Sequence, residues 1–545
     1  MKRALAIAAV LGPLVLFALW PVAALLYRAL AGQLSALAII AAPASTEALW
    51  GTLRTSLGAA AIAFALGFPL ALVVARTDVP GRTALRALWV LPSAIPPFIQ
   101  GMGWVTLANP KAGLLNKLLG EGTFDIYGEP GTAFVLGIAA TPMVLLAAEA
   151  TLARLDPALE ESARVFGSSP LRALVGVSGA LAFPAALAGA TLAFLFSASA
   201  FGVPYLLGVT ANPPVHTLTT RIYVEWLKGP VGLARAAALS LTLLVMAALV
   251  LVISERLGKR ARVALGAGKG VAKRQLQLGP WRAPLAVWAW SSALLLVVLP
   301  LAAVALTSVM PTFGRLDGLT FAHWGAVLGH KDTIAASTRS LWMALLAGVL
   351  VAGLGLVFAL AQRRLGAAGR AAAVLAAWPY AVPGTVLALG LIVAFSRDLR
   401  FVFFDSIAFV LALGGTVWLL VIGWTVKHLA FGVRNASEGL ARVDQSLPES
   451  ARVFGAAPGR AFFDATLPQL RAPLAAAFTL TFLTCVTELT LAVLMVPSGT
   501  QTLGTLLFEL QSYADPASAA VIACAFVLLV LASLGGLAAL RRRTA

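Results

Sequence analysis

Apolar runs of about 20 residues alternate with short polar segments along the whole chain. A helix of that length crosses the hydrocarbon core of a bilayer. The spacing of the runs predicts twelve membrane-spanning helices, six in each half. They are expected at residues 4–30, 51–76, 84–108, 132–153, 183–208, 231–253, 284–310, 338–362, 371–396, 405–430, 472–496 and 517–540.

Six spans return a chain to the side on which it started, so the two halves are expected to have the same orientation. Residues 1–255 form the first half and residues 280–545 the second, and an axis along the membrane normal should relate them. Between them, residues 256–279 are rich in Gly, Ala, Lys and Arg. Their composition predicts a solvated tether. The fold class is therefore an all-α integral membrane protein built from two parallel six-helix repeats.

One polar segment occurs twice at an offset of 288 residues. Residues 152–173 and 440–461 are identical at 15 of 22 positions when counted along the sequence, and residues 161–167 recur letter for letter at 449–455. A repeated polar patch on a scaffold that is otherwise only hydrophobic is typical of a docking surface. We call these segments the first and second repeat loops.

Each repeat loop is expected to fold as helix, glycine turn, helix. In the first, Asp156-Pro157 fits a helix start, Gly167 a left-handed helix end, and Ser169-Pro170 a second start. Helical spacing predicts one apolar face that leaves out the polar side chains. The apolar residues of that face are Leu155, Leu159, Ala163 and Phe166, and the polar residues off it are Asp156, Glu160 and Arg164.

Composition and charge agree with a membrane protein. Hydrophobic residues make up 60% of the chain and charged residues 11%, and the formal net charge is +18. Most of the basic residues lie in alternate loops, which include both repeat loops and both termini. The positive-inside rule therefore predicts that these loops and termini are cytoplasmic. The pattern does not resemble a nucleic-acid-binding face, and residues 1–30 are expected to be a retained span rather than a cleaved signal peptide.

Two pairs of prolines interrupt equivalent spans. Pro92 and Pro96 in the third span match Pro379 and Pro383 in the ninth. Such breaks in helical hydrogen bonding are tolerated in lipid only where protein or a water-filled cavity covers the backbone. The prolines therefore predict kinked helices that line a substrate pathway, with a simple packing kink as the alternative.

Polar side chains inside the spans are scarce, and each is a candidate for the pathway. Ser197 and Ser199 lie in the fifth span, and Thr484, Thr487 and Glu488 lie in the eleventh. Glu488 corresponds to Ala200 in the first half. An ionisable residue at membrane depth is a functional candidate by default. The alternative is a carboxylate near the interface or one satisfied by a neighbouring helix.

Chemistry of other kinds is not recognisable in the sequence. It contains no phosphate-binding glycine loop, no His/Cys cluster with metal-ligand spacing and no nucleophile with a partner base. Its two cysteines, Cys485 and Cys524, fall inside apolar spans and are expected to be buried thiols. Another subunit must therefore supply the energy if transport is active.

The repeat loops resemble the cytoplasmic motif of ABC importer permeases. That motif begins Glu-Ala-Ala and has a glycine six residues after the glutamate. Glu161-Ser-Ala163 with Gly167, and Glu449-Ser-Ala451 with Gly455, match it except for the serine. Leu467-Pro468 also fits the motif's usual end, whereas the first half has Ala180 there. The resemblance implies coupling helices that dock on an ATP-binding subunit through Glu161, Ala163, Arg164, Phe166, Gly167, Glu449, Ala451, Arg452, Phe454 and Gly455.

The same resemblance implies partners and cargo. It implies two copies of the ATP-binding subunit, a periplasmic substrate-binding protein, an inner-membrane location, no metal or cofactor on this chain, and ATP with Mg²⁺ on the partner subunit. Two fused halves are similar to ferric-iron permeases, and also to those for thiamine, polyamines and aminoethylphosphonate. Residues 201–208 and 217–223 look most like the iron group. A secondary transporter with parallel repeats and an integral membrane enzyme are the alternative classes, but both would be expected to show more intramembrane charge or a His or carboxylate cluster.

Overall fold

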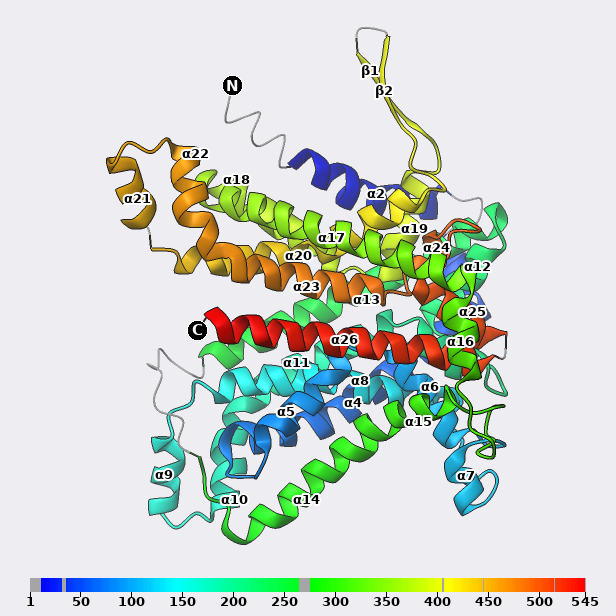
Figure 1. The fold of residues 1–545 in the computed structure, drawn as a ribbon, viewed down its shortest axis with the longest axis vertical. Coiled ribbons are helices and arrows are strands. Elements are labelled where there is room, and N and C mark those ends of the chain that lie inside the picture. Colours follow the sequence, from blue (N-terminus) through cyan, green and yellow to red (C-terminus); the bar gives the residue numbers. More distant parts are fainter. Residues whose placement is uncertain are drawn as a thin grey trace.

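The computed structural model describes residues 11–31, 36–263, 275–403, 406–444, 446–513 and 515–544. Long helices run roughly side by side through the molecule, and short helices lie at their two ends (Figure 1). Helices α9 and α21 of the repeat loops project at one end, which we call the repeat-loop end. Helices α7, α12, α16 and α25 lie at the opposite end (Figure 1).

The helices of the first half, π- and 3₁₀-turns included, are η1 Val15–Leu19, α2 Trp20–Leu30, α3 Ala36–Ala41, α4 Pro43–Arg76, α5 Arg82–Val90, η2 Leu91–Ser93, α6 Pro97–Ala108, α7 Leu114–Leu119, α8 Gly128–Leu152, α9 Ala158–Val165, α10 Pro170–Ala173, η3 Leu174–Gly179, α11 Ala180–Ser199, η4 Pro204–Val209, α12 Leu218–Leu227 and α13 Pro230–Val263.

The elements of the second half are η5 Gly279–Trp281, α14 Arg282–Ala293, η6 Leu294–Val298, α15 Leu299–Thr307, α16 Ala322–Gly329, α17 Lys331–Arg364, α18 Ala367–Ala377, η7 Trp378–Ala381, α19 Gly384–Ala394, β1 Leu399–Phe403, β2 Ser406–Leu411, α20 Val417–Arg442, α21 Ser446–Val453, α22 Pro458–Ala461, η8 Phe462–Thr466, η9 Leu467–Leu470, α23 Arg471–Val486, α24 Ala492–Met495, α25 Leu503–Ser512 and α26 Pro516–Thr544.

Ten helical segments within the described ranges are long and apolar enough to cross a membrane. An eleventh, Ala367–Ala381 followed by Gly384–Ala394, bends by 109° at its break. The corresponding segment of the first half divides in the same way, into α5, η2 and α6. The predicted helical membrane architecture is confirmed, but the third and ninth spans are broken helices rather than single kinked ones.

Three further predicted spans are not continuous helices. The fifth and eleventh helical runs end at Ser199 and Val486, and separate short helices follow each. The predicted span 405–430 was wrong at its start, because strands β1 and β2 pair antiparallel there and α20 begins only at Val417. Val, Ile and Phe make up much of the sequence of these two strands, and such residues favour the extended backbone over a helix.

The segment between the halves is also more structured than a solvated tether. Helix α13 continues to Val263, and Leu276 and Leu278 are buried. The amide of Leu276 donates to the carbonyl oxygen of Arg76 over 2.7 Å, and a parallel bridge joins Leu276 to Thr77. Burial of the two leucines explains why this end docks although its surroundings in the sequence are polar. The rest of the predicted tether, 264–274, lies outside the described residues.

The first membrane span of each half, Leu11–Leu30 and Gly279–Thr307, packs against the broken helix of the other half. Helix α2 contacts α19, and α15 contacts α6. A Cβ on Gly103 would collide with the carbonyl oxygen of Pro300, and one on Gly390 would lie 2.9 Å from that of Pro21. Only glycine permits both approaches. This reciprocal exchange is the arrangement that a twofold axis between parallel repeats produces.

Candidate functional site

Both repeat loops fold as helix, glycine turn, helix, as predicted. Helix α9 is followed by a turn at Gly167 before α10, and α21 is followed by a turn at Gly455 before α22. Both glycines have φ of 87°, in the left-handed region that side chains disfavour. The two local geometries are therefore the same.

Aspartates begin both loop helices. Asp156 accepts from the amide of Ala158 over 2.9 Å, and Asp444 accepts from that of Ser446 over 3.0 Å. The Ser446 amide stabilises the charged carboxylate and so lowers the pKa of Asp444. These contacts satisfy amide groups that a helix start leaves free.

The apolar side chains of the two loop helices face outward. Val165 and Phe166 are 84% and 89% exposed, and Val453 and Phe454 are 84% and 90% exposed. Of the apolar face that helical spacing predicts, Leu155 is buried, whereas Leu159 and Phe166 are exposed. The reason is that α9 turns a carboxylate rather than its aromatic ring toward the protein. Two identical, exposed Val-Phe pairs are what a protein-binding surface requires.

That carboxylate belongs to Glu160, which forms a buried ion pair with Arg76 at the end of α4. The Nη2–Oε2 distance is 2.9 Å and the Nε–Oε1 distance 3.1 Å, and both side chains are at most 6% exposed. Ser178 of η3 donates to the same carboxylate, and Arg76 also donates to the Leu155 carbonyl oxygen over 3.4 Å. A two-pronged, fully paired contact of this kind fixes α9 rigidly to α4.

The second repeat loop lacks this tie. At the offset of 288, Pro448 stands where the first loop has Glu160, and Arg364 stands where it has Arg76. Arg364 is exposed, and its neighbour Arg363 donates instead to the backbone oxygen of Leu440. The two loops therefore present the same outer surface but attach to the spans differently.

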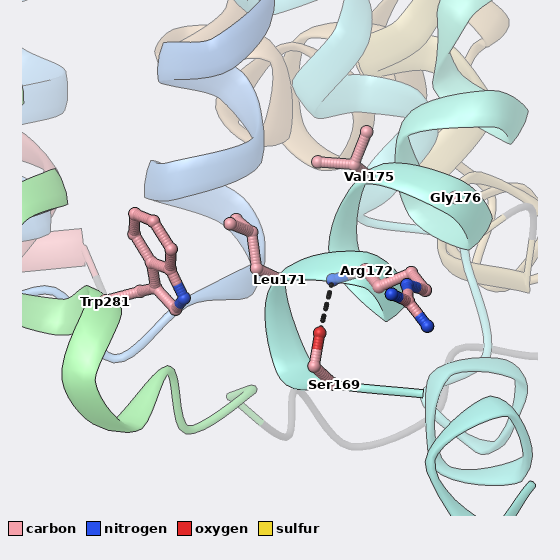
Figure 2. Close-up of a pocket in the computed structure, with 6 residues that line it drawn as sticks. All are labelled: Ser169, Leu171, Arg172, Val175, Gly176 and Trp281. Atoms are coloured by element: carbon pink, nitrogen blue, oxygen red, sulfur yellow. Dashed lines mark hydrogen bonds between the residues drawn. The ribbon is translucent and has the colours of Figure 1, made fainter. Parts of the chain in front are cut away.

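A shallow pocket of about 430 Å³ borders the first repeat loop. Figure 2 shows Trp281, from the start of the second half, facing Leu171 of α10 across it. Ser169 accepts from the amide of Arg172 at its rim over 3.4 Å. The remaining lining residues are Val175 and Gly176. The second half thus reaches the base of the first half's loop.

The four prolines mark the breaks in the third and ninth spans. Pro92 and Pro379 are buried inside the 3₁₀ turns, and Pro96 and Pro383 precede α6 and α19. Polar side chains engage backbone oxygens at these breaks. Gln100 donates to Pro92 over 3.4 Å and Lys427 donates to Val382 over 3.2 Å. At each break, a side chain of the protein thus donates a hydrogen bond to a backbone oxygen, as is needed where water is excluded.

Glu488 lies just beyond the end of α23 and not within a helix. Its carboxylate accepts from the indole of Trp424 over 3.1 Å and from the amides of Leu491 and Ala492 over 2.9 and 3.2 Å. The prediction of one helix through Glu488 was therefore wrong. The side chain instead caps the short α24 and holds it to α20.

The other predicted pathway residues do not converge on Glu488. The Thr484 and Thr487 hydroxyls bond to backbone oxygens of their own helix, at Leu480 and Leu483. Ser197 is buried with no partner for its hydroxyl among the described residues, and Ser199 ends α11. Sequence reasoning missed Arg76 and Ser178 altogether, because neither carries a local signal that points to Glu160.

Comparison with known proteins places these features in a family. A model of the "Binding-protein-dependent transport system inner membrane component" matches residues 67–263 and 344–545, which together exceed half of the chain. An Fe(3+)-transport system permease protein of Haemophilus influenzae is 24% identical over 89% of this chain and 88% of its own length. A ferric transport system permease protein of Actinobacillus pleuropneumoniae is 23% identical over 80% of this chain and 62% of its own length.

Shorter relatives match one half. A molybdenum transport system permease protein of Mycobacterium tuberculosis is 28% identical over 42% of this chain and 84% of its own length. The doubled family match agrees with two parallel halves in one multi-pass membrane protein. Such proteins are transport components rather than enzymes, and they work with a binding protein and an ATP-binding partner. The chain therefore belongs to the family of binding-protein-dependent transport system inner membrane components.

Proposed function

We propose that this chain is the permease of an ATP-driven importer whose cargo is ferric iron. The carrying observation is the end-to-end match to an Fe(3+)-transport permease, which spans 89% of this chain and 88% of the relative. The molybdenum relative covers only 42% of the chain, a single half. The presence of two fused halves in one chain is thus shared with the iron relative and not with the molybdenum relative. Thiamine, polyamines and aminoethylphosphonate are the alternative cargoes.

In this proposal the two repeat loops are cytoplasmic and each binds one copy of the same ATP-binding subunit. The support is the identical exposed pair Val165-Phe166 and Val453-Phe454, carried on turns of equal geometry. Equal surfaces fit two equal grooves. ATP and Mg²⁺ would be bound by those subunits, and this chain would bind no cofactor. Both chain termini would be cytoplasmic, and a periplasmic binding protein would deliver the cargo at the opposite end.

Charge reversal on both loops tests the docking. Glu161→Lys with Glu449→Lys should abolish uptake and reduce co-purification of the ATP-binding subunit, while membrane insertion stays normal. Phe166→Ala with Phe454→Ala should weaken the same association, because buried aromatic anchors dominate such interfaces. Leu118→Ala in α7, an exposed apolar residue at the opposite end, is the control. It should change neither uptake nor co-purification of the ATP-binding subunit. Normal uptake by the correctly inserted Glu161/Glu449 variant would refute the docking role.

The cargo is tested separately by uptake of radioactive iron into proteoliposomes. The complex would be reconstituted with its ATP-binding subunit and binding protein. We expect ATP-dependent iron uptake that molybdate, thiamine and aminoethylphosphonate do not compete away. ATP-dependent uptake of one of those compounds instead of iron would keep the importer and replace the cargo.

A further inference from the structure

Helices α12 and α25 at the end opposite the repeat loops are counterparts in the two halves (Figure 1). Each begins with a pair of threonines that cap one another, Thr217 with Thr220 and Thr502 with Thr505. The first amide of each helix donates to a hydroxyl of a long helix, Leu218 to Thr52 over 2.7 Å and Leu503 to Ser340 over 2.8 Å. Thr52 and Ser340 are themselves 288 residues apart (340 − 52).

Tyr223 and Phe508 occupy the same place in these two helices. Each lies six residues after the capping threonine, since 223 − 217 and 508 − 502 are both 6. Their ring centroids are 6.4 Å apart and the rings are nearly perpendicular, at 87°. Two residues that a twofold axis exchanges can touch only if the axis passes between them. This contact therefore lies on the line where the two halves meet.

Rings from the first half surround Phe508 at this point. The centroid distances are 6.1 Å to Phe98, 5.6 Å to Phe201 and 4.8 Å to Tyr205. Phe508 is 8% exposed and Phe201 1% exposed, so the cluster is closely packed. It draws on the two segments, 201–208 and 217–223, that stood out in the sequence.

A second layer beside this cluster is also closed. A Cβ on Gly202 would lie 2.9 Å from the ring of Phe98 in the first half and 3.2 Å from the side chain of Leu489 in the second. The two halves thus leave no room for an added methyl group there. Leu489 directly follows Glu488, so the turn that Glu488 holds reaches this layer.

We propose that Tyr223 and Phe508 form the gate that closes the central path at the end opposite the repeat loops. The proposal rests on the proposed importer function, which makes that end periplasmic, but not on the cargo. The contact consists of aromatic faces and edges, so the rings can separate without leaving a buried charge unpaired. Movement of the halves apart would separate α12 from α25 and open the path.

Crosslinking measures whether the contact opens. Tyr223→Cys with Phe508→Cys would be placed in a Cys485→Ala, Cys524→Ala background, together with a protease site within residues 264–274. Cleavage then separates the halves unless a short bis-maleimide joins positions 223 and 508. Thr106→Cys with Thr307→Cys is the matched control, because these hydroxyls are 2.8 Å apart across the exchanged contact between α6 and α15.

We expect the 223–508 crosslink in the nucleotide-free complex with its ATP-binding subunit. It should fall about tenfold when an ATPase-inactive subunit is trapped with ATP and the binding protein, a shift that needs about 1.4 kcal/mol of differential binding. The control pair should crosslink equally in both states. Equal crosslinking at 223–508 in both states would overturn the gate. Failure of the ATP-binding subunit to co-purify with the wild-type chain would instead overturn the proposed function.

A second variant makes the same test without crosslinking. Phe508→Ala should raise ATP hydrolysis in the absence of binding protein by about tenfold, since it removes contacts made only in the closed state. Tyr223→Phe keeps the ring and should leave hydrolysis at the wild-type rate. Phe183→Ala is the control, because its ring partners Phe64 and Phe68 both belong to the first half. Unchanged hydrolysis in Phe508→Ala would argue against the gate.

Discussion

Glu488 illustrates how a single residue can differ from the role that its position suggests. As an ionisable residue in an apolar segment it predicts a cargo ligand. Its oxygens are nevertheless engaged by the Trp424 indole and by two backbone amides. The carboxylate therefore positions the turn that leads to Leu489. We expect Glu488 to affect transport through the position of this turn, because a direct contact with a cation would have to share these hydrogen bonds.

We expect Glu488→Gln to slow uptake and to leave assembly with the ATP-binding subunit intact. A glutamine keeps one acceptor oxygen but cannot hold the indole and both amides with two equivalent charged oxygens. Initial uptake rates in proteoliposomes and co-purification would measure the two effects. Trp424→Phe removes the indole donor alone and should slow uptake in the same direction. Wild-type rates in both variants would show that this cap has no part in transport.

At the scale of elements, the tie between α4 and α9 distinguishes two loops that otherwise look alike. Arg76 and Glu160 are paired and nearly inaccessible to water, and the backbone oxygen of Arg76 also accepts from the amide of Leu276 in the segment between the halves. Three elements therefore meet at one residue. In the second half the proline at 448 removes the corresponding carboxylate. A displacement of α9 must pass directly into α4, whereas α21 has no such link at the equivalent position.

Glu160→Gln should destabilise the protein by about 3–5 kcal/mol, because it leaves the buried guanidinium without its counter-charge. Loss of the tie should also reduce uptake more than it reduces ATP hydrolysis. Thermal unfolding in detergent and the ratio of uptake to hydrolysis would measure the two effects. Arg364→Gln, at the exposed counterpart of Arg76, is the control and should change stability by less than about 0.5 kcal/mol. Similar losses in both variants would contradict a role specific to the first loop.

The sequence predicts local features of these elements better than their contacts. The loop turns follow from Asp156, Gly167 and their repeats, because caps and left-handed glycines act within a few residues. The Arg76–Glu160 pair joins residues 84 positions apart, and no local period encodes it. Strand β2 was mistaken for the start of a span because a short apolar run is compatible with helix or strand.

On the scale of the whole molecule, the alternating basic loops and the two ends of the structure suggest one orientation. The repeat loops, rich in arginine, lie at one end, and α12 and α25 lie at the other (Figure 1). By the positive-inside rule we expect the repeat loops to be cytoplasmic. In the same orientation, the contact between Tyr223 and Phe508 would be periplasmic.

Thiol labelling in intact cells tests this orientation. In the background without native cysteines, a cysteine at exposed Lys259 should be protected from a membrane-impermeant reagent, and one at exposed Gly120 should be labelled. Both should react after the membrane is permeabilised, which shows that protection reflects sidedness. The reverse pattern in intact cells would move the repeat loops to the outside and remove the basis for ATPase docking.

The exchange of first helices has a consequence for biogenesis. Helix α6 carries Gly103, whose close neighbour Pro300 lies 197 residues later in the chain (300 − 103). At translation rates of about 5–20 residues per second, Pro300 is synthesised roughly 10–40 s after Gly103, and this surface of α6 has no α15 to pack against until then. During that interval the nascent first half must be held in lipid or by an insertion factor. The halves can complete each other only after synthesis of the second has begun.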